Sequence, residues 1–254
     1  MLVEAHAKIN FTLQVLGKRP DGYHDLRSIV LPVPLHDDVH IDEACEVMVA
    51  FDADSPCLES GLADLPQEKN LAWRAADALR RATGCNRGAA IRIVKRIPSG
   101  AGLGGGSADA AAVLNGLNEM WELHLPKRRL CEIAAEVGSD VPALTLGGAV
   151  LMEGRGERVT PLEESPMADY PVPDMGRLVL RTPPVFVSTP AVFREFRKED
   201  CGKGANDLQP AACRLHPEIS AALAELEAEG CEGVAMSGSG AAVFGWRPLD
   251  VQFR

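Results

Sequence analysis

The sequence predicts an α+β protein built from two halves. Strand-like and helix-like segments are mixed along the 254 residues without the strict alternation that a parallel α/β sheet requires. A polar, proline-rich stretch at residues 160–176 is the best candidate for a boundary between the halves. The chain is long enough for one large domain or two modest ones. We therefore predict domains at residues 1–157 and 158–254.

The first predicted element is a strand. From Ala7 onward, the stretch "AKINFTLQV" alternates polar and apolar residues with the period of a half-buried strand. Lys8 and Asn10 share the polar face of this strand. The turn "KRPDGYHD" follows, and it contains the turn-forming residues proline, aspartate and glycine. Further strands are predicted at "DVHID" and "CEVMVAF".

The next predicted elements lie before and after a glycine-rich loop. A helix is predicted over "NLAWRAADALRRATG", with Asn70 near its N-cap and Gly84 past its end. The strand "AIRIVKRI" leads into the loop, and a second helix then runs over residues 107–121. A third helix follows Pro126 and stops at Gly138.

The second half has fewer predicted elements. A strand is expected at "RLVLR", a helix opened by Thr189 and Pro190, and a longer helix over residues 217–230. A strand pair is expected around "MSGSG". The chain ends at Arg254, soon after that pair.

Composition limits the classes of partner. The net charge of −10 and the pI near 5.1 argue against a general attraction to nucleic acid or to an anionic membrane. The seven cysteines are scattered and form no C-x-x-C pair, which is typical of reduced thiols. The N-terminus has no signal-peptide pattern and no apolar run reaches membrane-spanning length. We therefore expect a cytoplasmic protein; the sequence gives no oligomeric state.

The glycine-rich loop is the strongest functional signal. In "IPSGAGLGGGSADAAAVLNGL", glycine occupies five of the seven positions from 100 to 106. A strand, a glycine loop and a helix start form an anion site, because backbone N–H groups and the helix dipole converge there. Tight packing between helix and sheet is the alternative, but so many glycines carry a large entropic cost and favour a ligand. The loop is predicted to hold the phosphates of a nucleotide.

Three familiar phosphate-binding patterns do not fit. A P-loop requires Lys-Ser or Lys-Thr after its last glycine, whereas this loop reads "GGGSAD". A dinucleotide-binding fingerprint can be placed on Gly100, Gly102 and Gly105, but the parallel βαβ repeats around it are missing. The H-R-D and D-F-G segments of protein kinases are absent.

The loop "PSGAGLGGGSADAAA" resembles the second motif of the GHMP kinases, which wrap ATP phosphates with a glycine-rich loop. Other segments agree in order: "AKINFTLQVLGKRPDGYHDLRS", "GSDVP", "GRGE", "ND" and "MSGSGAAVFG". "DGYH" is similar to the branch of the family that acts on a cytidine diphosphate-linked methylerythritol, and it differs from the homoserine, mevalonate and galactose kinases. The resemblance implies a two-domain fold with a left-handed βαβ unit in the ATP-binding half. Because the family usually continues with another helix and strand after "AAVFGW", the second domain of this chain is expected to be shortened at its end.

The resemblance also implies the reaction. Members of this branch transfer the γ-phosphoryl group of ATP to a tertiary hydroxyl of the cytidine diphosphate-linked methylerythritol, in the non-mevalonate route to isoprenoids. Mg²⁺ is expected as a cofactor chiefly through the ATP phosphates, so no protein ligand is assigned. Ser107 is expected to contact phosphate or Mg²⁺. The ATP-binding residues implied are Pro98, Ser99, Gly100, Ala101, Gly102, Leu103, Gly104, Gly105, Gly106, Ser107 and Ala108.

Two residues carry the expected chemistry. Asp140 precedes a possible short helix, so it could be an ordinary N-cap; the resemblance implies that it is the base that accepts the hydroxyl proton. Lys8 could be a solvated strand lysine; the resemblance implies that it lies beside Asp140 and stabilises charge on the moving phosphoryl group. The second glycine turn, "MSGSG", is implied to lie against the ATP site, although it could be a simple hairpin connection.

The remaining site residues are implied to bind substrate. Tyr23 is expected to stack on cytosine and His24 to hydrogen-bond it, although such a pair could instead cover the edge of a core. Lys95 and Phe193 match further contacts of that pocket. Asn10 and Thr189 are further expected substrate contacts, and Thr189 could also cap its helix.

Two rival functions remain open from the sequence. One is a diphosphomevalonate-type decarboxylase on the same fold, against which "DGYH" argues. The other is a non-catalytic nucleotide-binding module, which would bind ATP without forming ADP.

Overall fold

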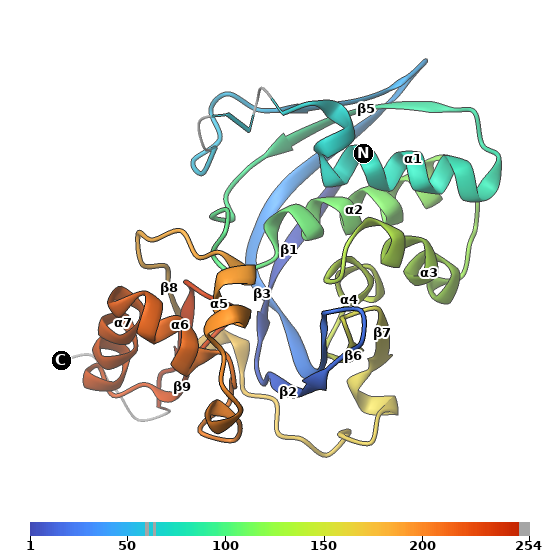
Figure 1. Cartoon of the computed structure of the whole chain (residues 1–254). Coiled ribbons are helices and arrows are strands. Elements are labelled where there is room, and N and C mark those ends of the chain that lie inside the picture. The colour runs from blue at the N-terminus through green and yellow to red at the C-terminus, as the bar shows by residue number, and fades with distance from the viewer. Residues whose placement is uncertain (59–60, 63–64, 249–254) are drawn as a thin grey trace.

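The computed structural model describes residues 1–58, 61–62 and 65–248, and it places them in two sheets covered by helices (Figure 1). The mixture of helices and strands confirms the predicted α+β class. Within the described residues, no helix is long and apolar enough to cross a membrane. All seven cysteines lie in the described part and are free thiols.

The larger sheet is organised around one long strand. Strand β3, His24–Ala44, pairs with β1 (Leu2–Asn10), β2 (Gln14–Lys18), β5 (Gly88–Val94) and β6 (Val150–Gly154), all antiparallel. Strand β7 (Arg158–Pro161) extends the sheet beyond β6, and β4 (Val47–Phe51) lies parallel to β5. The predicted strand at "DVHID" is therefore the end of β3.

One predicted strand is in fact two. The stretch that starts at Ala7 was expected to be continuous, but β1 begins earlier, at Leu2, and ends at Asn10, and β2 begins only at Gln14. Between them, the Leu13 N–H donates to the carbonyl oxygen of Ala205. The N–H groups of Phe11 and Thr12 still donate to the Ile29 carbonyl oxygen of β3, whereas both backbone hydrogen bonds of Leu13 go to the second half of the protein.

Four helices pack on one side of the larger sheet (Figure 1). They are α1 (Leu71–Thr83), α2 (Gly105–Met120), α3 (Lys127–Val137) and α4 (Val141–Leu146). The predicted ends of α1 are confirmed. The Asn70 side chain caps the helix by accepting the Ala72 N–H at 2.9 Å, and Gly84 ends it with φ of 71°. Helix α2 begins two residues before the predicted Ser107. The last glycines of the loop thus form its first turn.

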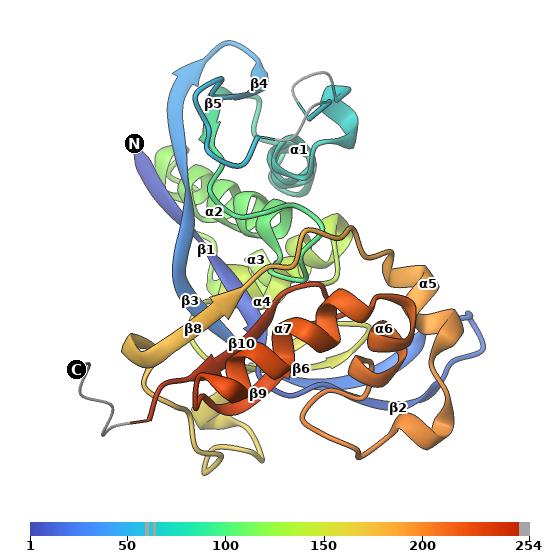
Figure 2. The ribbon, with the colours of Figure 1, turned by 90° about the vertical axis from the view of Figure 1, so that its left-hand side faces the viewer.

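The smaller sheet contains β8 (Leu178–Arg181), β10 (Val243–Trp246) and β9 (Glu232–Met236) in that order, all antiparallel. Figure 2 shows α6 (Gln209–Leu215) and α7 (Pro217–Ala228) lying over this sheet, with α5 (Thr189–Glu195) beside α6. The strand pair around "MSGSG" is confirmed, whereas α6 was not predicted. Short 3₁₀ turns at Gln67–Lys69, Leu162–Glu164, Met175–Arg177 and Lys198–Asp200 complete the elements.

The two sheets differ in extent from the predicted domains. Strand β7 lies beyond residue 157, and yet it pairs with β6 in the larger sheet. The division of the chain at 157/158 and the shortening of the second domain stay predictions, and so does the left-handed βαβ unit in the ATP-binding half. Residues 249–254 lie outside the described residues.

The glycine loop touches the glycine turn of the smaller sheet, backbone to backbone. Gly102 has φ of +76°, and a Cβ atom there would lie 2.4 Å from the Ser237 carbonyl oxygen and 2.9 Å from that of Gly240. Distances below 3.0 Å to backbone atoms cannot be relieved by a rotamer change. The contact therefore requires glycine at position 102.

We predict that Gly102→Ala destabilises the protein more than Gly84→Ala. Both glycines have similar positive φ, +76° and +71°, but a Cβ at Gly84 meets nothing within 4 Å. The control change should lower the free energy of unfolding by about 1–2 kcal/mol through backbone strain alone. The clash at Gly102 should lower it by a further ~1–3 kcal/mol. Urea unfolding curves of the two variants measure the difference, and equal losses would contradict the proposed contact.

Candidate active site

A large cleft of about 1120 Å³ lies between the two halves. Its walls come from β1, the turn before β3, the glycine loop, the start of α4, the segment around α5 and the second glycine turn. It brings together eleven of the residues predicted from the sequence: Lys8, Asn10, Tyr23, His24, Gly100, Gly102, Gly104, Ser107, Asp140, Thr189 and Phe193.

Lys8 lies at the centre of this arrangement. Its side chain is buried, and its Nζ donates to Asn10 Oδ1 at 2.6 Å and lies 3.2 Å from Asp140 Oδ2. Its stem packs on the loop, because a Cβ at Gly104 would lie 3.1 Å from Lys8 Cε. The view of Lys8 as a solvated strand lysine is therefore wrong. Its ammonium is held at one place on the wall of the cleft.

Asp140 occupies the N-cap position of α4 without acting as a cap. Its backbone is helical, and its side chain makes no capping hydrogen bond. The carboxylate instead pairs with Lys8, and about one third of the side chain remains exposed to the cleft. The N-cap alternative is wrong, because the carboxylate is directed toward the lysine and the open space.

Asn10 is fixed by three hydrogen bonds from different parts of the chain. Its amide oxygen accepts from Lys8, its Nδ2 donates to Ser28 Oγ at 2.8 Å, and its backbone N–H donates to Ser237 Oγ at 3.1 Å. Asn10 thus orients the ammonium of Lys8. Its expected contact with substrate stays a prediction.

The glycine loop turns its carbonyl groups into the protein. The carbonyl oxygens of Ala101, Gly102 and Leu103 accept from Ala242 N–H, Ser237 Oγ and Lys8 N–H, at 2.9, 2.8 and 3.0 Å. In a planar trans peptide, the N–H of the next residue points the opposite way. The first N–H groups of α2 also lack helical partners. The loop therefore presents backbone donors, which suit an anion.

A second pocket of about 370 Å³ shares the loop with the cleft. Gly100, Gly102, Gly104 and Ser107 line both spaces, and Pro98, Ser99, Ala101, Gly105 and Gly106 line the second. Its lining combines the apolar side chains of Phe51, Leu62, Leu65, Leu71 and Ile97 with the polar ones of Lys69, Asn70, Lys95 and Asp109. A flat apolar ring could lie there while its attached phosphates reach the loop.

Two members of the predicted ATP-binding set point elsewhere. Leu103 and Ala108 are buried in the main hydrophobic core, and their side chains line neither the cleft nor the second pocket. The prediction took residues 98–108 as one contiguous set. Because the loop and α2 pack on the core, some of these residues direct their side chains into the core instead of toward a ligand.

Lys95 does not lie with Tyr23 and His24, and this corrects the expected place of its side chain. It lines the second pocket, and its buried Nζ pairs with Asp37 and, at 2.7 Å, with Asp109 Oδ2. The cause is the position of Lys95 at the end of β5, directly behind the first turn of α2. Its ammonium is already occupied by two carboxyl groups.

These two carboxyl groups differ in their surroundings. Asp37 also accepts the backbone N–H groups of Arg96 and Ile97, whereas Asp109 Oδ1 has no hydrogen-bond partner in the described part of the chain. Burial raises the pKa of Asp109 to about 7, against the opposing charge of Lys95 and with a further contribution from Asp37. Lys95 thus lies between two buried carboxyl groups, of which Asp109 keeps its proton to a higher pH than an ordinary aspartate. Sequence analysis missed both acids; the only hint of Asp109 is its place two residues after Ser107.

The other end of the cleft is aromatic. The His24 ring stacks on Phe193 at 4.9 Å with an interplanar angle of 16°, and it meets the edge of Phe196. Burial, with a smaller contribution from the charge of Lys18, lowers the pKa of His24. Its ring is therefore favoured in the neutral form, with one donor and one acceptor.

Tyr23 and Thr189 stand at the rim of this aromatic end. Tyr23 is 58% exposed, and the guanidinium of Arg155, from the "GRGE" segment, lies 5.1 Å from its ring centroid. Thr189 makes no cap, because the N-cap of α5 is Ser188; its hydroxyl instead lies 2.7 Å from Ser239 Oγ. Sequence analysis missed the roles of Ser28, Arg155 and Ser239, whose contacts join segments far apart in the chain.

Comparison with known families gives two matches. GHMP kinases N terminal domain matches residues 70–148, which contain the glycine loop and Asp140. GHMP kinases C terminal matches residues 189–250, which contain α5 and the second glycine turn.

Several known proteins are similar over nearly the whole chain. The 4-diphosphocytidyl-2-C-methyl-D-erythritol kinase of Symbiobacterium thermophilum is 41% identical, over 98% of this chain and 91% of that protein. The protein of the same name from Citrifermentans bemidjiense is 42% identical, over 95% and 87%. A crystal structure of 4-(cytidine 5'-diphospho)-2C-methyl-D-erythritol kinase has a TM-score of 0.77 at 34% identity, over 97% of this chain and 90% of that one.

We predict that the buried Asp109 carboxyl gives a pH-dependent stability. From its ordinary value of 3.8 up to about 7, the folded protein keeps a proton that the unfolded chain releases. The contribution of this carboxyl to the free energy of unfolding therefore falls as pH rises through that window. Asp109→Asn cannot ionise, so wild type should lose stability relative to this variant between pH 4.5 and pH 7.5. Urea unfolding at several pH values tests this, and parallel profiles would contradict the buried, protonated carboxyl.

Proposed function

Because this chain belongs to the GHMP kinase family, we propose that it transfers the γ-phosphoryl group of ATP to the 2-hydroxyl of 4-diphosphocytidyl-2-C-methyl-D-erythritol. This reaction belongs to the non-mevalonate pathway to isoprenoids. Relatives that carry the name of this kinase match nearly the full chain at about 40% identity. The observation that carries the proposal is the Lys8–Asp140 pair, which faces the cleft between the glycine loop and the aromatic end.

The loop and the second pocket are proposed to bind ATP. The phosphates would lie on the backbone donors of residues 100–107, and the adenine against the apolar wall that includes Phe51 and Leu71. Lys8 packs against Gly104 and pairs with Asp140, while Lys18, Arg155 and Arg194 also line the cleft. Lys8 is therefore proposed to contact the transferred phosphoryl group.

Mg²⁺ is proposed as the second cofactor, brought to the site by the ATP phosphates. The Ser107 hydroxyl and the Asp140 carboxylate both line the cleft and offer oxygen atoms, the ligand type that Mg²⁺ prefers. When bound, the ion neutralises phosphate charge. The residues of the chain have the remaining task of aligning the two reactants.

The transfer can be written with these groups alone. The 2-hydroxyl of the substrate gives its proton to Asp140, and its oxygen forms a bond to the γ-phosphorus as the bond from that phosphorus to the ADP oxygen breaks. The ammonium of Lys8, 3.2 Å from Asp140 Oδ2, stabilises negative charge on the attacking oxygen and on the phosphoryl group. Asn10 keeps the ammonium in place.

The aromatic end is proposed to bind the cytosine. The exposed ring of Tyr23 offers a stacking surface, and the neutral His24 ring, held against Phe193, offers hydrogen bonds that distinguish cytosine from other bases. Thr189, beside Ser239, is proposed to contact the substrate between the two ends. The chain is proposed to act in the cytoplasm on a small-molecule substrate, and its net charge of −10 argues against nucleic acid or membrane partners.

We predict that Asp140→Asn keeps the fold and ATP binding but loses most of the phosphoryl transfer, by about 10²–10⁴-fold in kcat, since a general base is removed. ADP release with and without the cytidine diphosphate substrate measures the rate, and ATP titration measures binding. Asp169→Asn, at an exposed position outside the cleft, is the matched control. Full activity in Asp140→Asn would rule out Asp140 as the base. Folded wild-type protein that binds ATP but forms no ADP with this substrate would overturn the proposed function.

A second prediction separates the two ends of the site. Phe193→Leu should raise the KM for the cytidine diphosphate substrate by roughly 3–10-fold, because it removes the ring that holds His24, with little change in the KM for ATP. Phe51→Leu, in the apolar wall of the second pocket, should do the reverse. Steady-state kinetics with each substrate varied in turn tests both, and equal effects on both KM values in either variant would contradict the assignment.

A further inference from the structure

Four ionisable side chains form a square on β1 and β3, outside the reaction cleft. In the antiparallel register, Glu4 lies opposite Asp38 and His6 lies opposite His36, so all four project from the same face of the sheet. The rings of His6 and His36 are 5.2 Å apart. Two carboxylates directly opposite each other repel. Such a pair is stabilised by a cation placed between the strands.

The hydrogen bonds of the two histidines fix which nitrogen faces this square. His6 Nδ1 lies 3.0 Å from the Val33 carbonyl oxygen, and His36 Nδ1 lies 3.0 Å from that of Pro34. A carbonyl oxygen can only accept, so each Nδ1 carries the proton. In the neutral ring, each Nε2 therefore has a free lone pair. This pairing of a backbone carbonyl with the second ring nitrogen is the arrangement that orients histidines toward metal ions.

The lone pairs converge on the carboxylate of Glu4. His6 Nε2 lies 3.3 Å from Glu4 Oε2, and His36 Nε2 lies 3.9 Å from Glu4 Oε1. One ligand atom from each of the three residues lies within 4.8 Å of the others. Ligands that share one tetrahedral zinc ion at about 2.1 Å lie roughly 3.3–3.6 Å apart. Small side-chain rotations therefore bring the three into coordination distance.

Asp38 completes the negative side of the square. Its Oδ2 accepts from Arg96 at 2.7 Å, and its Oδ1 lies 3.4 Å from His36 Nε2. Arg96 thus holds this carboxylate in place while leaving one oxygen directed toward His36. Where the rings are neutral, their Nε2 lone pairs face carboxylate oxygens, and a cation at the centre of the square relieves that contact.

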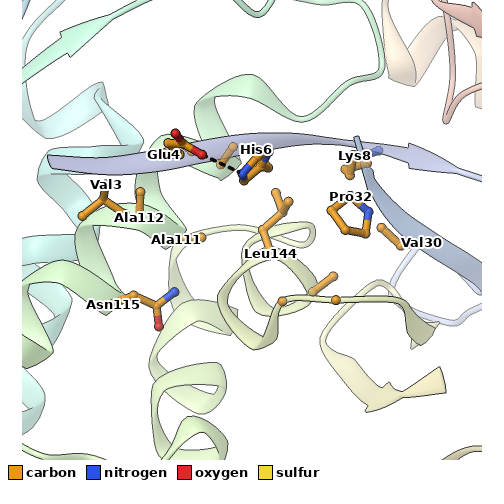
Figure 3. Close-up of a pocket in the computed structure, with 15 residues that line it drawn as sticks. Val3, Glu4, His6, Lys8, Val30, Pro32, Ala111, Ala112, Asn115 and Leu144 are labelled. Atoms are coloured by element: carbon orange, nitrogen blue, oxygen red, sulfur yellow. Dashed lines mark ion pairs between the residues drawn. The ribbon is translucent and has the colours of Figure 1, made fainter. Parts of the chain in front are cut away.

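We propose that Glu4, His6 and His36 form a binding site for a divalent transition-metal ion of the Zn²⁺ type, with Asp38 beside it. Two imidazole nitrogens and one carboxylate are a ligand set that such ions favour over Mg²⁺. The site is separate from the Lys8–Asp140 pair. Figure 3 shows Glu4 and His6 side by side on β1, with Lys8 further along the same strand, around a cavity of about 230 Å³ that lies between β1 and helices α2 and α4.

The site is open to solvent and can be loaded. The His6 side chain is 43% exposed and that of Glu4 56% exposed, so an ion reaches the ligands without unfolding. Neither His36 nor Asp38 lines the cavity or the reaction cleft. Replacing His36 therefore changes the metal site without touching the proposed catalytic residues.

Metal binding by the full-length chain, stripped of metal and kept reduced, tests the proposal. Titration with Zn²⁺ alone, followed by calorimetry, should show one ion per chain, and His36→Gln should raise the Kd at least tenfold. Glu4→Gln should weaken binding as well, while His216→Gln, a histidine distant from the square, should not. Circular dichroism checks that each variant is folded.

Co²⁺ identifies the ligands, because the seven free thiols could capture zinc elsewhere. Cobalt at the proposed site gives visible bands of a nitrogen and oxygen ligand set without the intense near-ultraviolet band of a thiolate ligand, and these bands should disappear in His36→Gln. A thiolate band, the absence of stoichiometric binding, or a Kd unchanged in both His36→Gln and Glu4→Gln would each overturn the proposal.

Discussion

The backbone contact between the two glycine turns is the constraint on which the rest of the structure depends. Gly102 approaches the carbonyl oxygens of Ser237 and Gly240 so closely that no side chain fits between them. Around this contact, the loop carbonyl oxygens already accept hydrogen bonds from within the protein. The donors are Ser237 Oγ and the backbone N–H groups of Ala242 and Lys8. The opposite edge of the loop is thereby left with its N–H groups directed outward. One contact thus joins the two sheets, forms the cleft and prepares the anion site.

Two buried lysines on either side of this loop show how surroundings decide what a charge can do. Lys95 lies between two buried carboxyl groups, and its ammonium is saturated within the protein. Lys8 faces one carboxylate that is partly open to the cleft and one neutral amide. A buried cation that lacks a second anion in the protein can accept one from a ligand. Lys95 therefore secures the frame, and Lys8 is available to an anionic group of a ligand.

The sequence predicted most of the features that are determined by residues close together in the chain. The cap of α1, the glycine loop, the order of the motifs and the α+β class all follow from residues close together in the chain. Three features depend on contacts between distant segments: the break between β1 and β2, the pairing of Lys95 with Asp37 and Asp109, and the orientation of Asp140. The alternation from Ala7 to Val15 continues across the break, although Ile9 packs in the main core and Leu13 and Val15 pack in the core of the second half. Nothing in that pattern shows that Leu13 bonds to Ala205. Likewise, the polar face of a strand gave no sign that Lys8 would be buried.

The 21-residue strand β3 has a consequence for how this protein tolerates change. It begins at His24 in the aromatic end, passes the metal-site square at residues 36 and 38, and ends beside β5. Its side chains alternate between faces, so a shift of one residue reverses every one of them. Single substitutions along β3 have local effects, whereas the insertion or deletion of one residue near Val33 would displace all the pairings on one side of it at once. Length variation among proteins of this fold should therefore be concentrated in the connections and be absent from this strand.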